Sequence, residues 1–325
     1  MRILVTGCAG FIGYHLCLKL LNDKTNKVFG IDNINDYYDI NLKKKRLSNL
    51  KKKFKKFIFY KKDICDLNFL QNNFLKNKYD VVVNLAAQAG VKYSIDNPKA
   101  YLESNIFGFF NILELSRINK IKHLIYASTS SVYGLNNNFP LKEETDTNHP
   151  LSFYAATKKS NEIMAHSYSN IYGLPCTGVR LFTVYGPYGR PDMSLFKFTK
   201  AILESKIVNL FNFGNHVRDF TYIDDATNAV VKLIDKPPRK KIPYAIYNIA
   251  SSKPRNLKFF LKMIEKFLGK KAKIKYKTLQ LGDVKKTFAS IKLLQKKVGF
   301  VPNTDIEQGI EKFIEWYRNN KLKLH

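Results

Sequence analysis

The stretch VTGCAGFIG, residues 5–13, decides the fold. It joins an apolar run, RILVTG at residues 2–7, to a segment at residues 11–22 with the periodicity of a helix. Its three glycines are Gly7, Gly10 and Gly13. Glycines at such a junction let the backbone turn sharply and let a pyrophosphate approach the helix N-terminus. The spacing G-x-x-G-x-x-G between a strand and a helix therefore predicts a dinucleotide-binding βαβ unit.

Two acids follow at the ends of the next apolar runs. Asp32 ends KVFGID, nineteen residues after Gly13. An acid at this place accepts hydrogen bonds from the adenosine ribose and repels a 2′-phosphate, which predicts NAD rather than NADP. Asp63 ends the third run, where it is expected near the adenine or, as the alternative, at a helix N-cap.

Short apolar runs alternate with helical segments through the first half of the chain. The expected strands are residues 2–7, 27–32, 56–63, 79–87, 122–128 and 175–182, and the expected helices include 11–22, 98–119 and 152–172. This alternation predicts an α/β fold, with a Rossmann-type doubly wound parallel sheet in an NAD-binding domain at residues 1–180.

The pattern changes to mixed short elements after residue 180. They are a helix at 194–205, a strand at 218–223, a helix at 224–236, a strand at 245–250, and helices at 256–268 and 305–320. We expect a smaller mixed α/β substrate-binding lobe over residues 181–325, with some strands or helices returning to the first domain.

Composition limits the other classes of function. The net charge is +29, but the lysines are spread along the chain, and the densest cluster, residues 43–56, has the spacing of an amphipathic helix. We therefore expect a solvated basic surface and no nucleic-acid partner. The four cysteines and six histidines show no metal-ligand spacing, so no metal is predicted. Without a signal peptide or a membrane span, the expected location is cytoplasmic.

Two further motifs carry the chemistry. SFYAATKKSNE places Tyr154 and Lys158 four residues apart, on one face of a helix. A lysine ammonium beside a phenol favours phenolate, so Tyr154 is a candidate base near neutral pH. Upstream, YASTSSVYG at residues 126–134 has four consecutive hydroxyl side chains and no acid.

These motifs together resemble the extended short-chain dehydrogenase/reductase superfamily, an NAD-dependent epimerase/dehydratase family. Further stretches resemble the nucleotide-sugar 4-epimerases, and among them the UDP-glucuronate 4-epimerases. They include GIDNINDYYDINLKKKRL, NLAAQAGVKYS, YAATKKSNEIMAHSYS, LFTVYGPYGRPDMSLFKFTKAI, RDFTYIDD and GDVKKTFAS, and the resemblance covers essentially the whole chain.

The resemblance implies an isomerase that oxidises C4 of a UDP-sugar with NAD and returns the hydride to the other face. Implied catalytic residues are Thr129, Tyr154 and Lys158. Implied cofactor-binding residues are Gly7, Gly10, Phe11, Ile12, Gly13, Asp32, Asp63, Ile64, Leu85, Ala86, Ala87, Tyr154 and Lys158. Implied substrate-binding residues are Ser130, Thr183, Arg190, Arg218, Asp283 and Lys92, where Lys92 replaces a common arginine. A homodimer formed through residues 98–119 and 155–172 is implied as well.

The missing acid separates related reactions. Dehydratases resemble TDEVYG in this segment and UDP-glucuronate decarboxylases resemble TSEVYG, whereas this chain has Ser130 and Ser131. Since neither serine carries a proton near pH 7, we expect epimerisation rather than elimination. A 4-keto glucuronate is a β-keto acid, so Thr129, Ser130 and Arg190 are candidates to hold its carboxylate.

Three alternatives stay open at this stage. The enzyme could epimerise UDP-glucose or UDP-N-acetylglucosamine, since the residues do not fix the group at C5. The chain could instead be a non-catalytic NAD-binding regulator, although the presence of both Tyr154 and Lys158 argues against this. Nucleic-acid binding rests on the charge alone.

Overall fold

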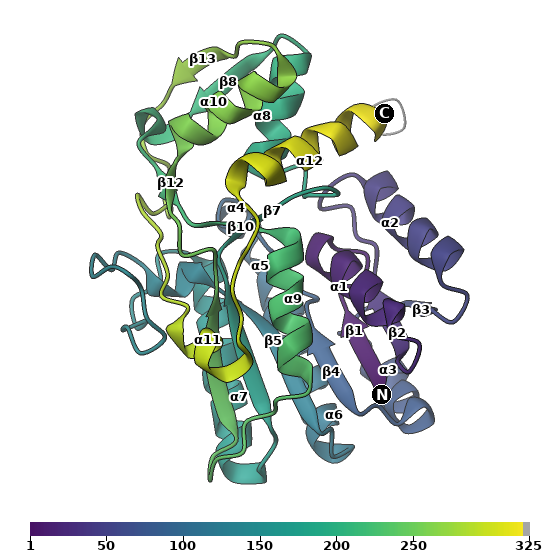
Figure 1. Ribbon diagram of the computed structural model, residues 1–325. Helices are drawn as coiled ribbons and strands as arrows, with labels where there is room; N and C mark the ends of the chain where they lie inside the picture. The colour runs from purple at the N-terminus through teal and green to yellow at the C-terminus, as the bar shows by residue number, and fades with distance from the viewer. Residues whose placement is uncertain (321–325) are drawn as a thin grey trace.

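Seven parallel strands form the central sheet, in the order β11-β6-β5-β4-β1-β2-β3, in a computed structural model that describes residues 1–320 (Figure 1). The strands are β1 (Arg2–Thr6), β2 (Lys27–Asp32), β3 (Ile58–Lys61), β4 (Val81–Asn84), β5 (His123–Thr129), β6 (Cys176–Leu181) and β11 (Tyr244–Ile249). The strand order reverses between β1 and β4, where doubly wound sheets bind nucleotides. The predicted Rossmann-type sheet is confirmed.

Helices cover both faces of the sheet. One face carries α1 (Phe11–Asn22), α2 (Ile40–Lys53) and α9 (Ile223–Ile234), and the other carries α3 (Leu67–Asn77), α6 (Gly108–Ile118) and α7 (Phe153–Tyr172). Figure 1 shows α1 and α9 side by side on their face. Within β1, Ile3 and Val5 belong to the first hydrophobic cluster and Leu4 to the second. Because successive side chains point to opposite faces, a strand buried on both sides is apolar throughout.

The expected helix at residues 98–119 is three pieces. They are α5 (Pro98–Tyr101), a π-helix η1 (Leu102–Phe107) and α6. A short helix, α4 (Tyr93–Asp96), precedes them. The π-helix turns the Asn105 side chain inward, where it accepts a hydrogen bond from the backbone nitrogen of Gln88 and donates to the Thr157 hydroxyl. This wider turn therefore ties the loop after β4 to α7, which a regular periodicity does not reveal.

The expected strand at residues 218–223 is interrupted. It is split into β9 (Val217–Arg218) and β10 (Phe220–Tyr222), and α9 begins directly at Ile223. Asp219 stands at the break because its carboxylate accepts hydrogen bonds from the backbone nitrogens of Ser251, Ser252 and Ala289. These bonds tie the break to the loop after β11 and to the segment before α11.

A smaller lobe packs beyond the end of the sheet (Figure 1). Its elements are β7 (Thr183–Tyr185), α8 (Ser194–Leu203), β8 (Ile207–Leu210), η3 (Phe211–Gly214), β12 (Arg255–Asn256), α10 (Leu257–Leu268), β13 (Lys273–Tyr276) and α12 (Ile306–Asn320). Aromatic contacts fill it, including the stacked rings of Phe220 and Phe260, whose centroids are 4.1 Å apart. The smaller α/β lobe is confirmed, while the boundary at residue 180 stays a prediction.

Three elements after residue 180 lie with the sheet. The strand β11 is its seventh member, and α9 and α11 (Lys292–Val298) pack beside it. Across the described residues 1–320, none of the helices combines the length and the apolar character needed to cross a bilayer.

Candidate active site

The glycine turn leaves the N-terminus of α1 open to a ligand. Gly7 has a φ of +70°, and a Cβ there would lie 2.7 Å from the Ala86 nitrogen. A Cβ on Gly13 would lie 2.1 Å from the Gly7 oxygen, so only glycine lets α1 begin against this turn. Gly10 is the N-cap and supplies no side-chain cap to the first turn of α1. Free backbone amides at a helix N-terminus attract an anion such as a pyrophosphate.

Asp32 lies beside this turn, at the end of β2. Its two carboxylate oxygens accept hydrogen bonds from the backbone nitrogens of Ala9, at 3.0 Å, and Ile34, at 2.8 Å. Burial raises the pKa of Asp32, and these bonds together with the Lys43 ammonium oppose that shift. A carboxylate has about four acceptor positions, so Asp32 keeps capacity for ribose hydroxyls.

One cleft of about 840 Å³ runs past the carboxyl ends of the strands. It is lined by most of the residues predicted from the sequence: Gly7, Gly10, Phe11, Ile12, Gly13, Asp32, Asp63, Ile64, Leu85, Ala86, Ala87, Lys92, Thr129, Ser130, Tyr154, Lys158, Thr183 and Arg190. The volume falls within the range of small-molecule sites. The glycine cradle, the uncapped helix and Asp32 fit a dinucleotide at one end of this cleft.

Helix α7 presents Tyr154 and Lys158 to the cleft. The helix starts there because the Ser152 hydroxyl caps it, accepting a hydrogen bond from the Ala155 nitrogen. The Lys158 ammonium donates to the Ala127 carbonyl oxygen at 2.9 Å. Burial lowers the pKa of Lys158 to about 8.

The phenol of Tyr154 differs from the sequence expectation. Burial raises its pKa, and a hydrogen bond with Thr129 offsets only part of the shift. The Lys158 ammonium is directed at a backbone carbonyl on β5. The charge that lowers the pKa of Tyr154 is that of Arg190, and its effect is smaller than that of desolvation. In this arrangement burial favours the protonated phenol, and a further positive charge in the cleft would favour the phenolate.

The four hydroxyls at the end of β5 have different tasks. Ser128 is buried and donates to the Glu162 carboxylate at 2.6 Å. Thr129 accepts a hydrogen bond from the Ser131 nitrogen at 3.2 Å, which starts the 3₁₀ turn η2 (Ser130–Tyr133). Thr129, Ser130 and Ser131 line the cleft, and none of them can carry a proton near neutral pH. The wall opposite Tyr154 therefore offers hydrogen bonds without acid catalysis.

Arg190 lies at the cleft but is already paired. Its guanidinium contacts the Asp192 carboxylate through two bonds, of 3.0 and 2.5 Å. Burial would raise the pKa of Asp192, but the guanidinium holds it below its usual value. The Tyr37 hydroxyl also donates to Asp192, at 3.2 Å. The sequence did not point to Asp192 or Tyr37. The contact between Tyr37 and Asp192 joins residues that are 155 positions apart, and the pair of Arg190 and Asp192 lies within one loop whose path has no periodicity.

Arg218 and Asp283 are not among the residues that line the cleft. The Arg218 guanidinium pairs with the Asp283 carboxylate at 2.8 Å, and His216 approaches the other oxygen at 3.2 Å. Their neighbours Phe211 and Gln280 do reach the cleft. The structure thus places the pair next to the far end of the cleft, and its contact with substrate stays a prediction.

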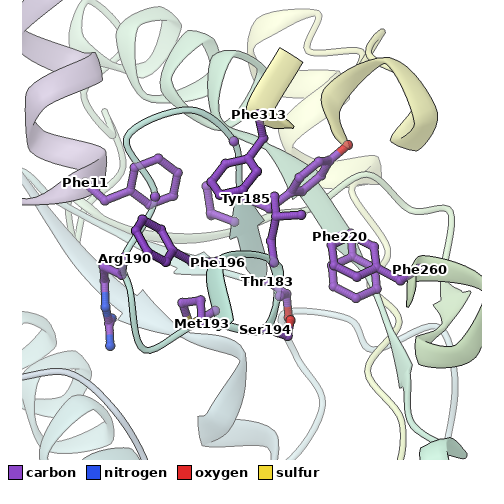
Figure 2. Close-up of a pocket in the computed structure, with 14 residues that line it drawn as sticks. Phe11, Thr183, Tyr185, Arg190, Met193, Ser194, Phe196, Phe220, Phe260 and Phe313 are labelled. Carbon is purple, nitrogen blue, oxygen red and sulfur yellow. The ribbon is translucent and has the colours of Figure 1, made fainter. Parts of the chain in front are cut away.

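A second, smaller hollow adjoins the cleft and shares lining residues such as Thr183 and Arg190 with it. Its volume is about 10 Å³, which is roughly one water molecule. Figure 2 shows the rings of Phe196 and Phe313 on one side of it, with the Arg190 side chain extending away from them. This hollow is too small for a substrate and leaves the large cleft as the ligand site.

The family model for GDP-mannose 4,6 dehydratase matches residues 4–313. The chain belongs to the GDP-mannose 4,6 dehydratase family. Protein CapI of Staphylococcus aureus is 50% identical, over 98% of both chains. A probable UDP-glucuronate 4-epimerase of Rhizobium meliloti is 41% identical, over 100% of this chain and 99% of its own.

Solved structures give the same likeness. The UDP-glucuronic acid 4-epimerase of Bacillus cereus, crystallised with UDP-glucuronic acid and NAD, superposes with a TM-score of 0.91. It is 34% identical, and the match covers 98% of this chain and 99% of that one. The chain thus matches the model of a dehydratase family and is also similar over its full length to an epimerase, so the name of the family does not fix the reaction.

Proposed function

We propose that this chain is an NAD-dependent 4-epimerase of a UDP-sugar and that UDP-glucuronate is its substrate. The observation that carries the proposal is that one cleft is lined by Tyr154, Lys158 and the hydroxyl side chains at residues 129–131. The glycine turn, which can accommodate a pyrophosphate, lines the same cleft. Full-length likeness to a UDP-glucuronate 4-epimerase crystallised with its substrate and NAD supports it.

The residues of the cleft have separable tasks. The open N-terminus of α1 binds the pyrophosphate of NAD, and Asp32 binds its adenosine ribose. NAD, when bound, supplies reversible hydride transfer and a positive charge near Tyr154. That charge favours the phenolate that burial disfavours, so Tyr154 takes the proton of the sugar 4-hydroxyl and later returns it. Thr129 orients that hydroxyl.

The hydroxyl wall accounts for the choice of reaction. An elimination across C5 and C6 needs an acid and a base, and Ser130 and Ser131 provide neither. With a glucuronate, loss of carbon dioxide from the 4-keto sugar leaves an enolate, which must take up a proton to become a 4-keto pentose. Without a proton carrier in this wall, return of the hydride to the sugar is favoured.

One observation favours a neutral UDP-sugar as a second candidate. The Arg190 guanidinium, the expected partner of a substrate carboxylate, is already held by Asp192. UDP-glucuronate binding requires Arg190 to share its donors or to leave Asp192, whereas UDP-glucose requires neither.

The last part of the proposal concerns the residues that bind the UDP moiety of the substrate. Arg218 contacts the diphosphate and Asp283 the uridine ribose, in exchange for their own ion pair. Lys92, an exposed residue at the rim, attracts the anionic substrate as a point charge.

The test is turnover of purified protein with NAD and UDP-glucuronate, UDP-glucose or UDP-N-acetylglucosamine in parallel, with products identified by NMR. We expect UDP-galacturonate to form fastest, and Tyr154→Phe to lose at least a thousandfold in kcat while keeping bound NAD. If UDP-glucose were turned over faster than UDP-glucuronate, the neutral UDP-sugar would be the substrate. Formation of a pentose or a 6-deoxy sugar as the main product would refute epimerisation.

A further inference from the structure

Arg46 on α2 is a buried cation that the chemistry of the cleft does not use. Its side chain is 0% exposed, and its hydrogen bonds go to carbonyl oxygens and one hydroxyl rather than to a carboxylate. Its Nε has no hydrogen-bond partner within the described structure. An apolar residue of similar length would fill this space without the cost of desolvating a charge, so packing alone does not explain Arg46.

The bonds of Arg46 join two loops that are far apart in sequence. One terminal nitrogen donates to the Ala9 carbonyl oxygen at 2.9 Å, within the glycine turn. The other donates to the Tyr188 carbonyl oxygen at 2.6 Å, in the loop at residues 186–192 that carries Arg190. A planar guanidinium has donors spaced to reach both loops at once, which a lysine ammonium does not.

Arg46 acts together with other contacts at each end of this bridge. On the cofactor side, the Ala9 nitrogen is bound by Asp32, so Ala9 is fixed through its N–H and its carbonyl together. On the substrate side, Tyr188 has a φ of +57°, a left-handed conformation that a non-glycine residue keeps only under constraint. Its ring lies 4.9 Å from that of Tyr14 and 4.8 Å from that of Trp316.

We propose that Arg46 is a positioning residue that sets the substrate loop at residues 186–192 against the glycine turn. It fixes the distance between the bound dinucleotide and the sugar, through the placement of Arg190 two residues after Tyr188. Hydride transfer depends steeply on this distance. The inference rests on the proposed function and adds a residue outside the cleft to it.

The test compares Arg46→Met, Arg46→Lys and the matched control Asn49→Ala. Asn49 is on the same helix and donates to the Tyr188 hydroxyl at 2.9 Å, but it does not reach the glycine turn. For each purified protein we measure the NAD retained, kcat and KM for UDP-glucuronate, and the pentose fraction of the product.

We expect Arg46→Met to lose at least tenfold in kcat/KM, to retain less NAD, and to raise the pentose fraction several-fold. Arg46→Lys should show the same changes to a smaller extent, and Asn49→Ala should match the unaltered protein in NAD content and product ratio. Wild-type values in Arg46→Met, or a fall in kcat/KM with an unchanged product ratio, would overturn the inference. Absence of turnover in the unaltered protein would refute the proposed function instead.

Discussion

Lys158 is held in a site that disfavours its own charge. The ammonium is buried with one carbonyl partner, and burial lowers its pKa to about 8 from a reference value of 10.5. Each pKa unit is worth about 1.4 kcal/mol, so burying the Lys158 ammonium lowers the stability of the fold by about 3 kcal/mol. This holds at a pH where the lysine is charged in both the folded and the unfolded chain. Such a cost gives no reason to keep the lysine for stability alone, and its place one turn after Tyr154 agrees with the catalytic role proposed for it.

This cost has a defined pH dependence. Between about pH 8 and 10.5 the unfolded lysine binds a proton that the folded one has released, so stability rises with pH across this window. We compare the free energy of unfolding of Lys158→Met with that of the unaltered protein at each pH. The difference should favour Lys158→Met more strongly below pH 8 than at pH 10.5. Urea unfolding of nucleotide-free protein at several pH values measures this. A difference independent of pH would contradict it.

Among the elements, β5, β6 and α7 are joined by a buried charge pair. Glu162 on α7 contacts Arg180 on β6 through two bonds of 2.8 Å, and Ser128 on β5 donates to the same carboxylate. The Arg180 guanidinium also lies 4.7 Å from the centre of the Tyr133 ring. The network fixes α7, and with it Tyr154, relative to the strand that ends in Thr129.

Removing the charge of Glu162 should therefore destabilise the fold. Glu162→Gln keeps the volume but leaves the Arg180 guanidinium buried without its counter-ion, which costs about 3–5 kcal/mol. The matched control is Glu103→Gln, which breaks the exposed Lys99–Glu103 pair and should change little. Urea denaturation at pH 7 measures both. Equal midpoints for the two variants would show that the buried network adds no stability.

How far the sequence predicts these features depends on the range of the contacts. Gly7, Gly13, Asp32, Tyr154 and Lys158 could be identified because each belongs to a short motif within one βαβ unit or one helix. The π-helix at Asn105 could not, since its partner Thr157 is 52 residues away along the chain. The contact of Tyr37 with Asp192, the partner of Arg190, also depends on the path of two loops, which periodicity does not encode.

At the scale of the whole molecule, the net charge of +29 favours the binding of anionic ligands in the cleft. A positive surface attracts anionic UDP-sugars from solution and speeds their encounter with the cleft. It also repels a second copy of the chain, so any self-association must rest on an apolar face.

Such a face exists on the neighbouring helices α6 and α7. Phe107 at the end of η1, Phe110 on α6, and Ile163 and Ile171 on α7 are exposed, with 57% exposure for Phe107 and 59% for Ile163. Two adjacent helices that expose a common apolar stripe can pair with the same stripe of a second copy about a two-fold axis. We therefore predict a homodimer through α6 and α7, in agreement with the sequence resemblance.

Light scattering on a sizing column tests the dimer. We expect about twice 37.6 kDa for the unaltered protein, and 37.6 kDa for the double variant Phe107→Glu with Ile163→Glu, because buried carboxylates would face each other across the axis. The control is Ile207→Glu, which places the same charge on the exposed face of β8 and should leave the dimer intact. Since α7 also carries Tyr154, pairing would stiffen the catalytic helix, and the monomeric variant should lose kcat without losing bound NAD. A monomeric unaltered protein would contradict the dimer, and full activity of a monomeric double variant would show that pairing does not affect Tyr154.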